Sequence, residues 1–178
     1  MALLPGRYPL EGCNISRDDI VTIQDATIIW PNFSGEKNDM NAEGDRNFNI
    51  HLTKQQADDL TADGWNVKCK QARPDDEDQV ERCVLKVTVK YTFRPPRIKM
   101  IGDKSRNETI LTEDIVGLLD QADIKTVDLS FVPYFWTMFP GTPKETDGVT
   151  AYLKTMYVEV IEDELDEKWD RIQAEARG

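Results

Sequence analysis

The 178 residues fit a single domain, with 39% hydrophobic residues and a formal net charge of −11 at pH 7. No run approaches the roughly 20 apolar residues of a membrane span, and the first residues are too short an apolar run for a signal peptide. Three widely spaced cysteines, Cys13, Cys69 and Cys83, suggest neither a disulfide framework nor a zinc knuckle, so we expect a cytoplasmic protein that folds without disulfides.

The first third of the chain predicts two strands separated by a loop. Residues Asp19–Trp30 hold β-branched residues with a break near Asp25, and Pro31 ends the strand. Residues 32–39 are rich in turn formers, which predicts an exposed loop carrying one aromatic ring, Phe33. In Arg46–Leu52, apolar and polar residues alternate as in a half-buried strand.

A short helix is predicted next. The sequence Thr-Lys-Gln-Gln from Thr53 matches a capping box, and Gly64 supplies a left-handed stop after about Asp63. Residues Trp65–Lys70 alternate again and predict a further strand.

The second half of the chain continues with strands. Val84–Phe93 alternates most clearly, and the prolines within Arg94–Arg97 end it or bend it at an edge. The remaining predicted elements are a short helix from Thr112 to Asp120, strands Val127–Trp136 and Ala151–Ile161 around a loop at 139–148, and a helix over 162–176.

Together these elements predict a mainly β protein with short helices, of the α+β class. The fold we expect is an OB-type small barrel or curled antiparallel sheet with a C-terminal helix. We divide the chain into an N-terminal arm (1–18), the main domain (19–161) and an acidic C-terminal helix or tail (162–178).

Enzymatic function is not indicated. The single histidine, His51, has no nucleophile elbow nearby, and no glycine-rich phosphate loop is present. The acidic runs lack the spacing of a calcium loop, so we expect no catalytic residue, metal or cofactor.

Charge is distributed unevenly along the chain. Val84–Ile110 carries seven bases and two acids, a net +5, whereas Glu159–Gly178 carries three bases and eight acids, a net −5. An acidic chain is a poor general polyanion binder, but a local set of cations and aromatic rings can still hold a single strand, because rings stack on bases while cations follow phosphates.

Candidate residues of this kind fall on predicted polar faces and loops. Tyr91 and Phe93 are in phase with core residues, whereas Tyr134 and Trp136 are in phase with Asp128 and Ser130. The candidate cations are Lys68, Lys70, Lys86, Lys90, Arg94, Arg97 and Lys99. The candidate rings are Trp30, Phe33, Tyr91, Phe93, Tyr134 and Trp136, of which Tyr91 and Phe93 are more typical of a core.

Several strings resemble a family of phage-encoded single-stranded-DNA-binding proteins. They are Trp30–Gly35, Asn41–Phe48, Asp63–Lys68, Tyr91–Ile98 and Ala151–Val158. The resemblance implies an OB-type fold, sequence-tolerant binding of single-stranded DNA, and a role in replication or recombination in the host cytoplasm. It implies replication or recombination proteins as further partners, no membrane, and leaves a homo-oligomer open.

The same strings hold further residues that the resemblance places near DNA. We add Arg46, Lys154 and Tyr157 to the predicted site, and Trp65, Phe48 and Tyr152 also lie in the strings, the first two in phase with the core. The chain departs from many proteins of this functional class by closing on Ala174–Gly178 rather than on acidic residues.

Two alternatives remain open. The first is a protein-interaction or virion structural module with an acidic C-terminal interface. The second is a metal-dependent nuclease whose carboxylates come together only in the folded protein. If the chain binds single-stranded DNA, the acidic C-terminal segment either competes with DNA for the cations or docks on the domain through Leu165, Trp169 and Ile172.

Overall fold

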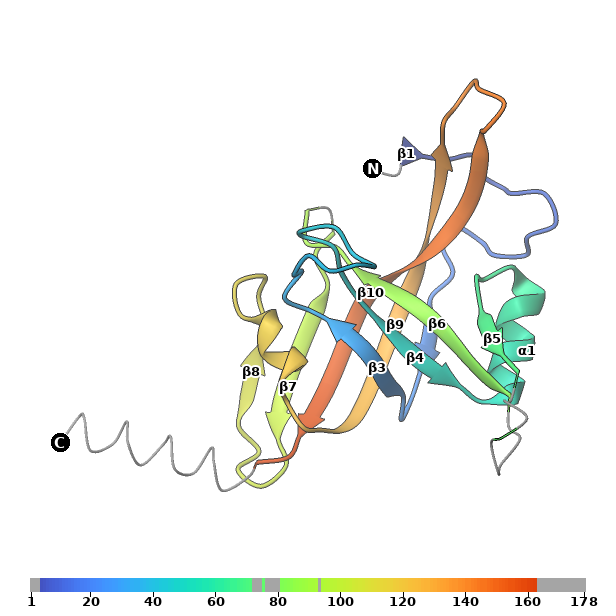
Figure 1. The fold of residues 1–178 in the computed structure, drawn as a ribbon. Helices are drawn as coiled ribbons and strands as arrows, with labels where there is room; N and C mark the ends of the chain where they lie inside the picture. The colour runs from blue at the N-terminus through green and yellow to red at the C-terminus, as the bar shows by residue number, and fades with distance from the viewer. Residues whose placement is uncertain (1–3, 72–74, 76–80, 93, 163–178) are drawn as a thin grey trace.

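In the computed structural model, residues 4–71, 75, 81–92 and 94–162 are described. They form one mixed sheet with a single α-helix and one turn of 3-10 helix (Figure 1). The elements are β1 (Leu4–Pro5), β2 (Val21–Ile23), β3 (Thr27–Asn32), β4 (Arg46–Leu52), α1 (Lys54–Asp63), β5 (Lys68–Lys70), β6 (Arg82–Val89), β7 (Arg97–Gly102), β8 (Glu108–Ile110), η1 (Val116–Asp120), β9 (Ile124–Met138) and β10 (Thr146–Val160).

The strand order places β10 at the centre of the sheet. The main path runs β1-β9-β10-β6-β4-β3, while β2 pairs with β9, β5 with β6, and β7 with both β10 and β8. β10 runs parallel to β6 near Tyr152 and parallel to β7 from Thr155 to Val160, and the other pairings are antiparallel. The two parallel pairings make the sheet mixed, unlike the antiparallel sheet expected from sequence. Among the described residues β3 pairs with β4 alone, so the sheet is not closed, unlike the expected barrel.

The strongest local predictions are confirmed. β4 has the predicted bounds, and α1 begins at a capping box in which the backbone N–H of Gln56 donates to the Thr53 hydroxyl and the backbone N–H of Thr53 donates to the Gln56 side chain. The helix ends at Gly64, whose φ of 114° is readily accessible only to glycine. These features depend on neighbours in the sequence, which is why the sequence predicts them well.

Alternation along the strands divides the sheet into a core side and an outward side. Phe48 and Ile50 of β4 lie opposite Val87 and Leu85 of β6, and all four are buried. The core also contains Trp65, whose ring meets that of Phe131 edge-on at 5.0 Å between centroids. The residues between them in sequence therefore face outward.

Phe33 was predicted to be an exposed loop aromatic, and this prediction is wrong. Its side chain is 0% exposed and stacks on Phe48 with 5.1 Å between ring centroids. The Asp120 carboxylate, at the end of η1, accepts hydrogen bonds from the backbone N–H groups of Phe33 (2.7 Å) and Ser34 (2.9 Å). This clamp turns the start of the loop inward and places the ring in the core.

The cysteines also differ from the sequence-based expectation. Cys69 of β5 lies directly opposite Cys83 of β6 and forms a disulfide with it, while Cys13 is a free thiol. The pairing joins a three-residue strand to the main sheet. Nothing in the spacing of 14 residues indicates the pair without knowledge of the strand register.

The second half of the chain contains more strand than predicted. β7 and β8 follow the Pro95–Pro96 stop, where no strand was expected, and η1 is a 3-10 turn rather than an α-helix. β9 and β10 each have 15 residues and extend past β6 as an arm, seen at the upper right of Figure 1. The predicted C-terminal helix lies outside the described residues, and none of the described helices is long and apolar enough to cross a membrane.

Candidate nucleic-acid interface

One continuous surface lies on the outward side of β3, β4, β5 and β6 and of the arm, which comprises residues 132–138 of β9 and 146–152 of β10. We call it the outward face. Register places Asn49 of β4 opposite Lys86 of β6, then Thr88 of β6 beside Tyr152 of β10. Its central positions are Ile29, Asn49, Lys68, Lys70, Arg82, Val84, Lys86, Thr88, Val132, Tyr134, Trp136, Gly148, Thr150 and Tyr152.

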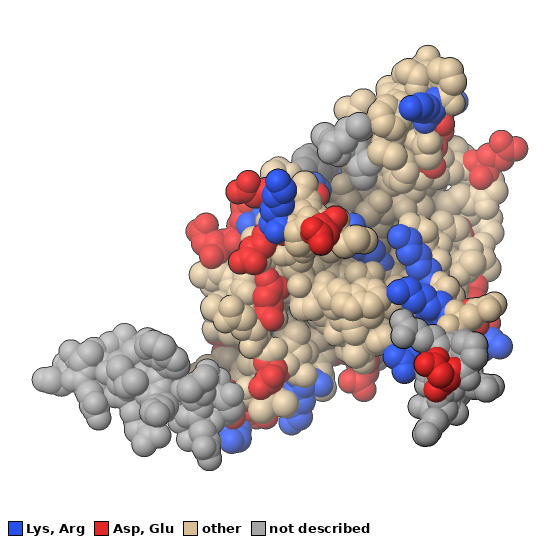
Figure 2. All heavy atoms as spheres, in the orientation of Figure 1, with Lys and Arg blue, Asp and Glu red and all other residues tan. Residues whose placement is uncertain are grey.

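Three lysines meet on this face. Lys68 and Lys70 alternate with Cys69 on β5, and Lys68 lies opposite Val84, two residues from Lys86 on the same side of β6. All three lysines are exposed. Figure 2 shows Lys and Arg side chains gathered over β5 and β6 in the middle of the viewed surface.

Trp30 lies across the same face. Its φ of 49° coincides with a register shift in β3, and its side chain is 60% exposed. The Lys70 ammonium lies 5.7 Å from the centre of its ring. Because β4 and β6 separate β3 from β5, about 14 Å at the usual strand spacing, the two side chains can meet only over the outward face. The indole is therefore a flat, accessible platform beside cations.

Aromatic rings continue onto the arm. Tyr134 and Tyr152 stack in parallel, 4.6 Å apart and 6° from coplanar. Trp136 lies opposite Gly148, and its indole N–H donates to the Thr150 hydroxyl at 2.9 Å. A Cβ on Gly148 would approach the Trp136 ring to 2.3 Å, so glycine is what lets this ring lie flat on β10.

The N-terminal segment buttresses the arm from its edge. β1 pairs with Trp136 and Thr137 of β9, and the backbone N–H of Gly6 donates to the Phe135 carbonyl at 2.9 Å. A Cβ on Gly6 would meet the Trp136 backbone at 2.4 Å, so only glycine permits this approach. The segment thus fixes the strand that presents Trp136.

The sign of charge on this face is opposite to that of the whole chain. In the described parts of β3, β4, β5, β6 and the arm, no outward position holds Asp or Glu, whereas the chain carries a net charge of −11. Acids therefore occupy other surfaces. The outward face combines cations with aromatic rings, an arrangement suited to a flexible polyanion with flat bases.

Burial keeps the central tyrosine neutral to a higher pH than an ordinary tyrosine. It raises the pKa of Tyr152 to about 12, and the neighbouring Tyr134 phenol acts in the same direction. A neutral phenol adds no negative charge to the face at physiological pH.

Alkaline titration provides a test of this environment. Between pH 10 and about 12 the unfolded chain ionises Tyr152 while the folded chain does not, so the free energy of unfolding should fall as pH rises through this window. Urea unfolding of the protein and of Tyr152→Phe, from pH 9 to 12, measures the effect. The variant should lose stability less steeply, and equal slopes would contradict the assignment.

The structure separates the predicted site residues into groups. Trp30, Lys68, Lys70, Lys86, Tyr134 and Trp136 belong to the outward face. Lys90 and Arg94 are exposed in the β6–β7 connection. Arg97, Lys99, Lys154 and Tyr157 instead line a groove of about 650 Å³ over β7, β10 and β9.

This second groove is less suited to a polyanion. Lys99 is paired with Glu108 at 3.1 Å, and Asp128, Ile20 and Ile110 also line the groove. Tyr157 lies five residues beyond Tyr152, past a register shift at Lys154, roughly 16 Å along β10. We therefore treat this groove as peripheral to the outward face.

Two predicted residues are engaged elsewhere. Phe33 is in the core, as described above. Arg46 lies in phase with Phe48, and its guanidinium pairs with Glu113 at 3.2 Å and lies 5.7 Å from the centre of the Tyr91 ring. Its side chain is only 19% exposed, so it serves to hold the β8–η1 connection.

The predicted site left out two members of the face: Tyr152, which was noted only as part of a family-like string, and Arg82, which was not named. Tyr152 alternates with the buried Ala151 and Leu153, and this alternation was visible in the sequence. Arg82 lies opposite Lys70, a relation that depends on the register of β5 against β6. The first residue was therefore accessible to sequence reasoning, and the second was not.

A family model described as "Putative phage ssDNA-binding domain" matches residues 13–177. The chain belongs to this family. The match covers the outward face, the arm and the peripheral groove. No curated protein sequence matches the chain.

Two solved structures are similar to this phage ssDNA-binding family member. One is the single-stranded DNA-binding protein from bacteriophage Enc34 in complex with ssDNA, at 10% identity and a TM-score of 0.46, covering 90% of this chain and 97% of that one. The other is a C-terminal truncation of the same Enc34 protein, at 10% identity and a TM-score of 0.46, covering 90% and 96%.

Proposed function

We propose that this protein binds single-stranded DNA on its outward face, without dependence on base sequence, in phage DNA replication or recombination. Lys68, Lys70 and Lys86 contact phosphates, while Trp30 and the arm rings Tyr152 and Trp136 stack on bases. The observation that carries the proposal is the acid-free outward face in a chain of net charge −11. Family membership supports it independently.

The rings explain a preference for single strands. A ring can stack only on a base whose face is open, and in a duplex both faces of each base are covered by neighbouring pairs. Stacking on base faces and contacts to phosphates do not read base edges, so we expect tolerance of sequence. The proposed role is to coat and protect a strand rather than to cleave it, which makes the protein non-enzymatic.

The fold and location follow the same proposal. The curled sheet, the helix between β4 and β5 and the projecting hairpin support an OB-type description of the domain. A protein that acts on replicating phage DNA works in the host cytoplasm, where thiols are kept reduced.

Fluorescence anisotropy with labelled oligonucleotides tests the proposal. Binding of a single strand should exceed binding of the matching duplex by at least tenfold, and it should weaken as salt rises because phosphate contacts release counterions. Equal affinity for both forms, or binding that is independent of salt, would refute it. An apolar assembly interface would give the salt-independent result.

The acidic segment 163–178 lies outside the described residues, and its effect is a separate prediction. It holds six acids and three bases and follows the last residues of β10. Deleting it should tighten binding severalfold at low salt, since it competes with phosphates for the same cations, and the gain should vanish at high salt. A well-folded deletion variant with unchanged affinity at every salt concentration would show that the segment does not compete.

A further inference from the structure

We propose that Cys69, Cys83 and Glu81 form a binding site for a thiophilic divalent cation such as Zn²⁺ when the two cysteines are reduced. The site lies at the junction of β5 and β6, on the core side of β5 and away from the outward face. It is distinct from the DNA contacts proposed above, and its existence does not depend on them.

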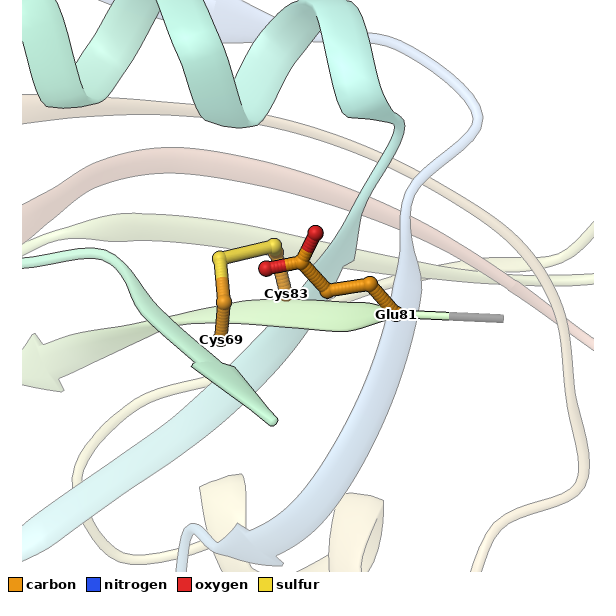
Figure 3. A group of neighbouring side chains, drawn as sticks. All are labelled: Cys69, Glu81 and Cys83. Carbon is orange, nitrogen blue, oxygen red and sulfur yellow. A yellow bond between two sulfur atoms is a disulfide. The ribbon is translucent and has the colours of Figure 1, made fainter. Parts of the chain in front are cut away.

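The geometry brings three ligand atoms together. Cys69 and Cys83 are directly opposite each other on antiparallel strands, so both sulfurs project to the same side of the sheet. The two sulfurs and a carboxylate oxygen of Glu81 all lie within 4.8 Å of one another. Figure 3 shows the Glu81 carboxylate directed at the sulfur pair. A tetrahedral zinc ion with bonds of about 2.3 Å holds two thiolates roughly 3.8 Å apart, which a cross-strand pair can reach.

The position of Glu81 is not explained by the disulfide. A disulfide sulfur carries no charge and offers a carboxylate neither a proton nor a cation. Within the described parts of the chain, no hydrogen bond or ion pair holds Glu81, although its carboxylate lies against the sulfurs. A cation bound by both thiolates would give that carboxylate a partner.

A groove gives solvent access to the same place. Its volume is about 640 Å³, and Cys69, Glu81 and Cys83 line it together with Lys54 and Asp58 of α1. The charges of Lys54 and Asp58 cancel, so the net negative charge of the groove comes from Glu81 and the two thiolates. The groove has room for a water molecule at the fourth position of a tetrahedral ion.

The compartment decides which form of the pair exists. In a reducing cytoplasm the disulfide is opened by a dithiol reductant, which gives up two electrons and two protons and becomes a disulfide itself. Binding of the cation to the two cysteines then releases both thiol protons. The cation would replace the disulfide as the link between β5 and β6. If the proposed DNA contacts are correct, this link also holds Lys68 and Lys70 in position.

Cobalt titration of the full chain tests the site. The protein is first reduced with a phosphine, which takes up the oxygen of one water molecule and leaves two thiols, and all three cysteines are then counted by thiol titration. Reduced protein should bind one equivalent of Co²⁺ with the near-ultraviolet absorption of thiolate ligation, and Zn²⁺ should displace it. Disulfide-bonded protein should show no such band. Absence of the band from fully reduced protein would overturn the proposal.

Variants assign the ligands. Cys69→Ser and Cys83→Ser should each abolish the thiolate band, and Glu81→Gln should weaken Co²⁺ binding roughly tenfold. Cys13→Ser is the matched control, since it removes a thiol elsewhere in the fold and should leave binding unchanged. A band that survives both cysteine variants overturns the site, and unchanged affinity in Glu81→Gln removes Glu81 from it.

Alkylation of the unmodified sequence provides a second readout if a cysteine variant fails to fold. Zn²⁺ should protect Cys69 and Cys83 of the reduced protein from iodoacetamide while Cys13 reacts at the same rate with or without the ion. Equal modification of all three cysteines in the presence and absence of Zn²⁺ would overturn the proposal.

Discussion

Alanine at Lys68, Lys70 and Lys86 together is expected to weaken binding of single-stranded DNA roughly 100-fold at about 50 mM salt, since each lysine lost removes a phosphate contact. The slope of log affinity against log salt should also fall by about 2, because a phosphate contact on a single strand contributes about 0.7. Stability should change little, as all three side chains are exposed. Anisotropy titrations at several salt concentrations measure both quantities.

A matched control separates position from charge. Lys54, Lys104 and Lys125 lie on α1, in the β7–β8 turn and at the start of β9, away from the outward face. Replacing these three with alanine changes the net charge by the same amount and should leave the affinity within about twofold. A similar loss in both triple variants would mean that overall charge, rather than the outward face, controls binding.

Phe33→Ala should lower mainly the stability of the protein, whereas Trp30→Ala should lower mainly its affinity for DNA, although the two residues are three apart in the sequence. Phe33→Ala removes a fully buried ring that stacks on Phe48, which should lower the free energy of unfolding by about 3–5 kcal/mol. Trp30→Ala removes an exposed ring, so stability should change by less than about 1 kcal/mol. DNA affinity should fall by about 1–3 kcal/mol in the Trp30 variant.

Denaturant unfolding and DNA titration of both variants check this pair of outcomes. Folded Phe33→Ala, examined at low temperature, should retain most of its affinity. Loss of DNA binding in Phe33→Ala without loss of stability would restore the sequence-based interpretation of Phe33 as a stacking ring. A destabilised Trp30→Ala would instead assign Trp30 to packing.

The elements that the sequence predicts well are those set by near neighbours. β4, α1 with its capping box, and the glycine stop all depend on residues within a few positions of each other. Phe33 shows the limit, because its burial depends on Asp120, 87 residues away. The hydrogen bonds that turn it inward leave no trace in the local pattern of polar and apolar residues.

The candidate site shows the same division. Alternation identified Lys68, Lys70, Lys86, Tyr134 and Trp136 as polar-face residues, and the structure places all of them on one face. Alternation alone does not show which strands are neighbours. The parallel pairing of β10 with both β6 and β7 places Lys86 beside the arm and sends Arg97 and Tyr157 to the peripheral groove.

The most direct test of the account is ultraviolet crosslinking of the protein to a single-stranded oligonucleotide, followed by mass spectrometry of the linked peptides. Crosslinks should occur at Trp30 and on the arm at Tyr152 or Trp136, since these rings lie on the outward face. They should be lost in the Lys68, Lys70 and Lys86 triple variant at moderate salt. Crosslinks confined to Tyr157 and the peripheral groove, with none on the outward face, would contradict the account.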